Sequence, residues 1–136
     1  MNTDIEMQSK EKISFVVVSC DKYKDLWDVF FHSFFKYWPD CPYEVYLVTN
    51  HLNYPSEKVH TIKIGEDGDY GTNLRKICDQ IPTDWFIYWF EDTPFSKPLD
   101  TTRIDKLLTT AQNENAGSCL LVPTYPVVYL KNETKL

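Results

Sequence analysis

The chain has 136 residues, of which 43% are hydrophobic and 25% charged, the composition of one globular domain with a hydrophobic core. Its formal net charge of −6 argues against a general nucleic-acid-binding protein, which usually presents a basic face. No apolar run is long enough for a membrane span, and residues 1–12 are polar with mixed charge, unlike a signal peptide or an anchor. We expect residues 1–12 to be a disordered lead-in and the protein to be cytoplasmic.

The N-terminal half of the chain predicts a strand, an aromatic helix and two further strands. Residues 13–19, "ISFVVVS", are apolar at nearly every position, which is typical of a strand covered on both faces. Residues 24–38 repeat Leu, Trp and Phe at helical spacing and stop before Pro39, which predicts an amphipathic helix. Residues 43–50 and 60–65 then predict two short strands.

The second half predicts two helices separated by a buried strand. A loop at 65–71 carries three glycines and leads into a predicted helix at 72–81, with Thr72 as its N-cap. The chain then continues through a strand at 84–90, a helix within 96–115 capped at Asp100 or Thr101, and one or two strands within 117–130. This alternation predicts an α/β fold with a mostly parallel sheet and helices on both faces.

Four cysteines, Cys20, Cys41, Cys78 and Cys119, stand far apart in the sequence. They form no CxxC pair and have no histidine at ligand spacing, so the sequence gives no support to a zinc site. Without an export signal, we expect free thiols.

Two predicted strands end in polar residues that should meet at one edge of the sheet. The first strand ends in Ser19-Cys20-Asp21, and the aromatic strand ends in Glu91-Asp92. Ligands of open parallel sheets bind beyond the carboxyl ends of the strands. Adjacent carboxylates repel one another, and Mg²⁺ or Mn²⁺, which prefer oxygen ligands, would compensate their charge.

The acidic pair also fits an ordinary turn. An aspartate after a strand often caps the next turn, and Pro94 in "EDTPF" would hold it. On periodicity and spacing alone, the turn is slightly favoured over a metal site. The sequence contains neither GxGxxG nor GxxxxGK[ST], which disfavours a dinucleotide fold and a P-loop kinase.

Two stretches together resemble one family. "VVVSCDKYKDLWDVFFHSFFKYWPDCPYEVYLVTN" is similar to the opening of GT-A-type nucleotide-sugar glycosyltransferases of bacterial polysaccharide synthesis. "GEDGDYGTNLRKICDQIPTDWFIYWFEDTPFSKPLD" resembles their next block, in which a loop and helix precede a strand that ends in an acidic motif. The resemblance covers residues 13–100 and fades after residue 120.

The resemblance implies a Rossmann-like fold, the N-terminal half of a GT-A enzyme, and binding of a UDP-, GDP- or dTDP-sugar for transfer to a polysaccharide or other acceptor. On this basis Ser19, Cys20 and Asp21 would lie beside the base and ribose. Asn73 would face the nucleotide across the sheet edge.

Carried over in the same way, Glu91 and Asp92 would occupy the acidic motif, with Asp92 the expected ligand of Mn²⁺ or Mg²⁺. Thr93-Pro94 depart from the family pattern, in which aromatic and apolar residues follow the acids. Family members also have a C-terminal part that binds the acceptor and carries the catalytic base, so no catalytic residue is assigned here.

Two alternatives remain open. Residues 13–136 would be a truncated, non-catalytic interaction domain of the same fold if the acceptor-binding part is lacking. A flavodoxin-like regulator with Mg²⁺-binding acids ranks last, because Lys131 is a poor match for the lysine that it needs. A missing half would leave the sheet uncovered, so we also expect self-association into a homo-oligomer.

Overall fold

The computed structural model describes residues 12–119, and the chain separates into two compact units, residues 1–101 and 102–136. The sheet and its connecting helices lie in the first unit. The predicted lead-in at 1–12, apart from its last residue, and most of the predicted strand region at 117–130 lie outside the described residues.

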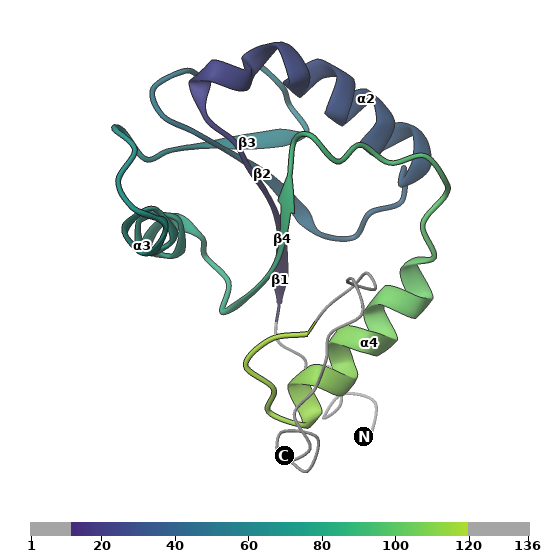
Figure 1. Ribbon diagram of the computed structural model, residues 1–136. Helices are drawn as coiled ribbons and strands as arrows, with labels where there is room; N and C mark the ends of the chain where they lie inside the picture. The colour runs from purple at the N-terminus through teal and green to yellow at the C-terminus, as the bar shows by residue number, and fades with distance from the viewer. Residues whose placement is uncertain (1–11, 120–136) are drawn as a thin grey trace, which may run out of the picture. The chain divides into compact units, whose positions relative to one another are not determined.

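A four-stranded parallel sheet forms the centre of the first unit (Figure 1). Its spatial order is β3-β2-β1-β4, and every neighbouring pair is parallel. The strands are β1 (Ile13–Val18), β2 (Glu44–Thr49), β3 (Val59–Lys63) and β4 (Trp85–Phe90). This arrangement confirms the prediction of an α/β protein built on a parallel sheet.

The predicted aromatic helix consists of two parts. A 3₁₀ segment, η1 (Asp21–Leu26), precedes the α-helix α2 (Trp27–Tyr37). Tyr23 interrupts the helical backbone within η1, with φ −101° and ψ 20°. The α-helix ends where Pro39 would remove the next backbone donor, and the backbone N–H of Trp38 makes the last bond to Phe34.

Helix α3 (Tyr70–Gln80) starts earlier than the sequence predicts. Its N-cap is Asp69, whose carboxylate accepts a hydrogen bond from the backbone N–H of Thr72 at 2.7 Å. This bond lowers the pKa of Asp69. The prediction of Thr72 as the cap is therefore wrong, because the aspartate three residues earlier already satisfies the N–H of Thr72. Helix α4 (Thr101–Asn113) confirms the helix expected within 96–115.

Helix α2 covers one face of the sheet with an aromatic core. Phe15 of β1 packs against Phe34 of the helix and against Trp38, the residue that caps it, with ring centroids 5.0 Å and 5.8 Å away. Phe95, which follows β4, also packs on Phe34 at 5.4 Å. The backbone N–H of Phe95 donates to the Ser33 hydroxyl at 3.1 Å, which fixes the segment after β4 along the helix.

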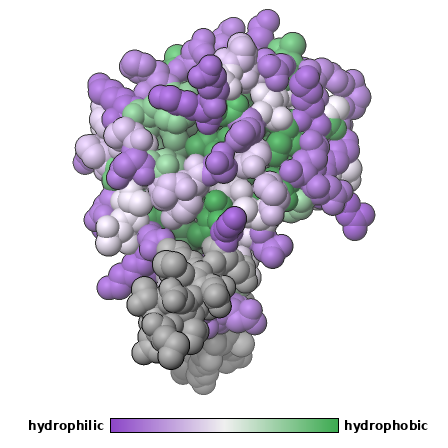
Figure 2. Space-filling model, turned by 180° about the vertical axis from the view of Figure 1, so that it is seen from behind, coloured by the Kyte–Doolittle hydropathy of each residue, from purple (hydrophilic) through white to green (hydrophobic). Residues whose placement is uncertain are grey.

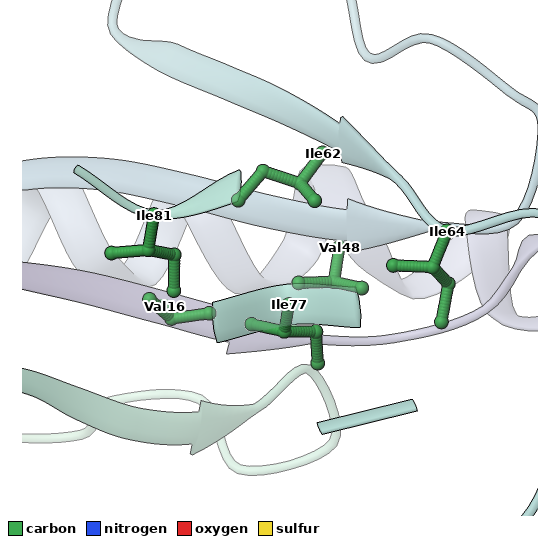
Figure 3. Packing of buried hydrophobic residues seen from close by; sticks show 6 residues of the cluster. All are labelled: Val16, Val48, Ile62, Ile64, Ile77 and Ile81. Atoms are coloured by element: carbon green, nitrogen blue, oxygen red, sulfur yellow. The ribbon is translucent and has the colours of Figure 1, made fainter. Parts of the chain in front are cut away.

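The opposite face carries an aliphatic core under α3 (Figures 1 and 3). The cluster comprises Val16, Val48, Ile62, Ile64, Ile77 and Ile81. The register pairs Val16 with Tyr88 and Val18 with Phe90, so β4 presents aromatic rings on this same face. Phe90 remains 46% exposed. Apolar patches are visible between polar side chains in the space-filling view (Figure 2).

Cys41, just after α2, should be an unreactive thiol. Burial, with the nearby charge of Asp40, raises its pKa to about 11 from 9.0. Since the thiolate is the reactive form, we expect its alkylation at pH 8 to be about a hundredfold slower in the folded than in the urea-unfolded chain. Mass spectrometry after iodoacetamide treatment measures both rates, with exposed Cys78 as the internal control. Equal rates for Cys41 in the two states would contradict the expectation.

Candidate functional site

The carboxyl ends of β1 and β4 border a cavity of about 410 Å³. In the sheet, β2 and then β3 lie on one side of β1, whereas β4 lies on the other side. The strand order therefore reverses between β1 and β4. In open parallel sheets such a reversal creates the crevice in which ligands bind. The lining residues are Val18, Ser19, Cys20, Tyr23, Leu26, Asp67, Phe90, Glu91 and Asp92.

Four residues that the sequence singled out line this cavity together. Ser19 and Cys20 come from the end of β1, and Glu91 and Asp92 come from the end of β4. They meet because β1 and β4 are hydrogen-bonded neighbours in parallel register. The structure therefore brings both predicted strand ends to one place.

Asp21 does not line the cavity but joins the loops that follow β1 and β2. Its carboxylate accepts hydrogen bonds from the backbone N–H groups of Asn50 and His51, both at 3.0 Å, and of Leu52 at 3.3 Å. In return, the backbone N–H of Asp21 donates to Oδ1 of Asn50 at 2.9 Å. Desolvation is the largest single influence and opposes ionisation, but the three backbone hydrogen bonds together outweigh it and lower the pKa of Asp21.

We expect the ionised carboxylate of Asp21 to stabilise the folded chain at neutral pH and to lose this effect in acid. Because the folded-state pKa lies below the ordinary 3.8, the stabilisation is present above that value and is lost as pH falls through the folded pKa. Asp21→Asn should lower the free energy of unfolding by about 1 kcal/mol at neutral pH, since a charged acceptor becomes neutral. Urea titrations at several pH values measure the difference.

The matched control for this variant is Asp25→Asn, an exposed position in the same 3₁₀ segment, which should change stability little. A deficit of Asp21→Asn that persists unchanged at pH 2 would show that the carboxylate charge is not its cause.

Asn50 connects the hydrogen bonds around Asp21 to Asp67, an acid to which the sequence assigned no role in the site. Its Nδ2 donates to the carbonyl oxygen of Gly65 at 2.8 Å and to Oδ1 of Asp67 at 3.0 Å. Asp67 thereby stays at the cavity wall. The available signal was its position in the glycine loop after β3, since that strand ends at the same edge of the sheet.

Asn73 lies in the first turn of α3, away from the lining of the cavity. Its Oδ1 accepts a hydrogen bond from the backbone N–H of Gly68 at 2.9 Å. A Cβ at Gly68 would come within 3.2 Å of the Thr72 side chain, so a larger residue here would require Thr72 to shift. In the structure Asn73 orders the glycine loop.

Glu91 is the buried carboxylate of the site, with only 7% of its surface exposed. Its Oε1 accepts a hydrogen bond from the Ser19 hydroxyl at 2.8 Å. The same hydroxyl oxygen accepts from the indole Nε1–H of Trp27, also at 2.8 Å. Within residues 12–119, Oε2 of Glu91 has no hydrogen-bond partner, although the residue lines the cavity.

Asp92 follows in an exposed turn. The backbone N–H of Thr93 bonds to the carbonyl oxygen of Phe90 at 3.3 Å, and the Thr93 hydroxyl donates to Asp92 Oδ1 at 3.3 Å. The turn that the sequence favoured is thus present. It does not exclude a ligand site, because both acids of the turn also line the cavity.

The oxygen donors at the cavity fit a hard divalent cation that arrives with a phosphate ligand. Within the described residues, no three His, Cys, Asp or Glu side chains are grouped closely enough to hold a metal on their own. Mg²⁺ and Mn²⁺ are commonly held by one or two carboxylates together with phosphate oxygens. Asp92 and the free oxygen of Glu91 would be the ligands from this chain.

Comparison with known proteins does not place the chain in a family, since no protein-family model, curated protein or solved structure matches significantly. Between residues 12 and 119, no helix is long and apolar enough to cross a membrane. Fold and site define an α/β protein with a cavity at the switch point of a parallel sheet, and its function has to be inferred from the residues around that cavity.

Proposed function

We propose that the chain binds a nucleoside diphosphate sugar through a divalent cation, as a GT-A-type glycosyltransferase or its donor-binding part. The observation that carries the proposal is the position of Glu91 and Asp92, which lie in the wall of a cavity at the switch point of the sheet. At about 410 Å³, the cavity is within the usual size range of small-molecule sites, roughly 300–1,000 Å³.

One side of the cavity is apolar and the other carries carboxylates, and these would suit the base and the cation-bound diphosphate of a nucleotide, respectively. Tyr23, Leu26 and Phe90 are 46%, 39% and 46% exposed, and all three line the cavity. A flat base can pack against such groups. The carboxylates of Glu91 and Asp92 supply the oxygen ligands for a cation on the diphosphate.

Charge makes the cation essential in this proposal. Three carboxylates, on Asp67, Glu91 and Asp92, line the cavity, and no Lys, Arg or His is among the described lining residues. A cation bound to the diphosphate would stabilise the negative charge on the leaving group during sugar transfer. The buried Glu91 and the exposed Asp92 would orient that end of the donor.

Isothermal titration with UDP, GDP and dTDP, each with and without Mn²⁺, tests the proposal. We expect heat with at least one nucleotide in the presence of Mn²⁺, and at least tenfold weaker binding by Asp92→Asn because a metal ligand is lost. Asp84→Asn is the matched control, since this exposed aspartate precedes the other end of β4. If none of the three nucleotides binds in the presence of Mn²⁺, the proposal is overturned.

The second candidate is a non-catalytic interaction domain, favoured by the aromatic rings of β4. Tyr88 and Phe90 lie on the face under α3 with ring centroids 5.1 Å apart, and Phe90 is 46% exposed. Within residues 12–119 no strand pairs with the outer edge of β4. Light scattering tests the expected homo-oligomer, and a monodisperse monomer would contradict it.

A further inference from the structure

Three side chains form a directed chain of hydrogen bonds that ends in the wall of the cavity. The indole Nε1–H of Trp27 can only donate, and it donates to Ser19 Oγ at 2.8 Å. The hydroxyl has a single hydrogen, and its good acceptor is Oε1 of Glu91 at 2.8 Å, compared with 3.4 Å to the carbonyl oxygen of Cys20. The order of donors therefore runs from Trp27 through Ser19 to Glu91.

The three residues come from separate elements. Trp27 begins α2, Ser19 follows β1 and Glu91 follows β4. Trp27 is 4% exposed and makes ring contact with Tyr54 at 6.0 Å, so its indole is held in place. A rigid buried donor thus fixes the hydroxyl, and the hydroxyl fixes one oxygen of a buried carboxylate.

We propose that Ser19 is a positioning residue, which holds Oε1 of Glu91 so that Oε2 remains available to a divalent cation at the cavity. The inference rests on the proposed function and deepens it, because it moves Ser19 from the base and ribose to the metal end of the ligand. Outer hydrogen-bond partners of metal ligands typically change metal affinity by about 10- to 100-fold when mutated.

The first test detects the hydrogen-bond chain from Trp27 through Ser19 to Glu91 without any ligand. The chain contains four tryptophans, so its ¹H–¹⁵N spectrum has four indole signals, and Trp27→Phe identifies one of them. We expect Glu91→Gln to shift the Trp27 signal more than the other three. In a Ser19→Ala background, Glu91→Gln should leave that signal unmoved. If Glu91→Gln shifts the Trp27 signal equally in the wild-type chain and in Ser19→Ala, Ser19 does not connect Trp27 to Glu91 and the inference is overturned.

The second test measures Mn²⁺ binding by electron paramagnetic resonance, with and without UDP. Ser19→Ala should weaken Mn²⁺ binding by about tenfold. Ser19→Thr, which keeps the hydroxyl, should restore most of the affinity, whereas a merely space-filling role would not separate these two variants. Unchanged Mn²⁺ affinity in Ser19→Ala would overturn the inference and leave the proposed function standing.

The wild-type arm separates the two claims. Failure of the wild-type chain to bind Mn²⁺, with or without UDP, would overturn the proposed function and the metal role of Ser19 together. Loss of Mn²⁺ binding in Ser19→Ala alone, with its rescue by Ser19→Thr, would support both.

Discussion

Phe34→Ala is expected to lower the free energy of unfolding by about 3–5 kcal/mol, the range for truncating a buried phenylalanine. Phe34 is fully buried at the centre of the aromatic core on α2. Its ring lies 5.0 Å from Phe15 and 5.4 Å from Phe95, measured between centroids. Rigid rings from a helix, a strand and a loop cannot collapse into the space, so the cavity persists. Urea denaturation measures the change.

Val29→Ala is the matched control on the same helix. Val29 is 61% exposed, so its truncation should alter stability by no more than about 0.5 kcal/mol. A loss below about 1 kcal/mol for Phe34→Ala would show that the aromatic core can repack, contrary to the close packing expected of protein interiors.

The sequence was most informative where periodicity and burial coincide. Strands β1 and β4 were expected at 13–19 and 84–90, and the structure has them at Ile13–Val18 and Trp85–Phe90. The unbroken apolar run of β1 is typical of a strand covered on both faces, and β1 is indeed buried, whereas β4 is only partly buried although its run looks the same. Strand order and register could not be predicted from the sequence, since they depend on contacts between distant residues.

Local hydrogen bonds account for the errors in helix boundaries. The apolar spacing over 24–38 does not reveal the change from η1 to α2, which involves the non-helical backbone of Tyr23. Likewise Thr72 has the right residue type for an N-cap, but Asp69 lies three residues before it and accepts its N–H. Residue type alone therefore placed the start of this helix too late.

The candidate site shows a similar division. The sequence predicts that Ser19 and Glu91 lie at the same edge of the sheet, because both follow strands, but their hydrogen bond also requires β1 and β4 to be neighbours, which the sequence did not predict. The engagement of Asp21 by the amides of residues 50–52 could not, because those amides come from another loop. Asp67 was interpreted from the sequence as a solvated loop acid rather than a site residue, because its hydrogen bond with Asn50, 17 residues away in the chain, depends on a contact between two loops.

Removal of the divalent cation is expected to weaken UDP binding by at least about a hundredfold. Asp67, Glu91 and Asp92 line the cavity without a basic residue among the described lining residues. Unit charges about 4 Å apart near a protein surface interact by on the order of 4 kcal/mol, and about 1.4 kcal/mol corresponds to a factor of ten in affinity. The diphosphate would therefore be repelled once its cation is gone. Titration of UDP in Mn²⁺ and in EDTA measures the ratio.

Uridine, which has no phosphate, separates this electrostatic effect from packing of the base. Its contacts would be with the apolar wall of Tyr23, Leu26 and Phe90, so its weak affinity should be the same in Mn²⁺ and EDTA. Asp67→Asn should strengthen the binding of UDP in EDTA, because it removes one repelling charge without removing either expected metal ligand. Equal UDP affinity with and without the cation would contradict the role assigned to these carboxylates.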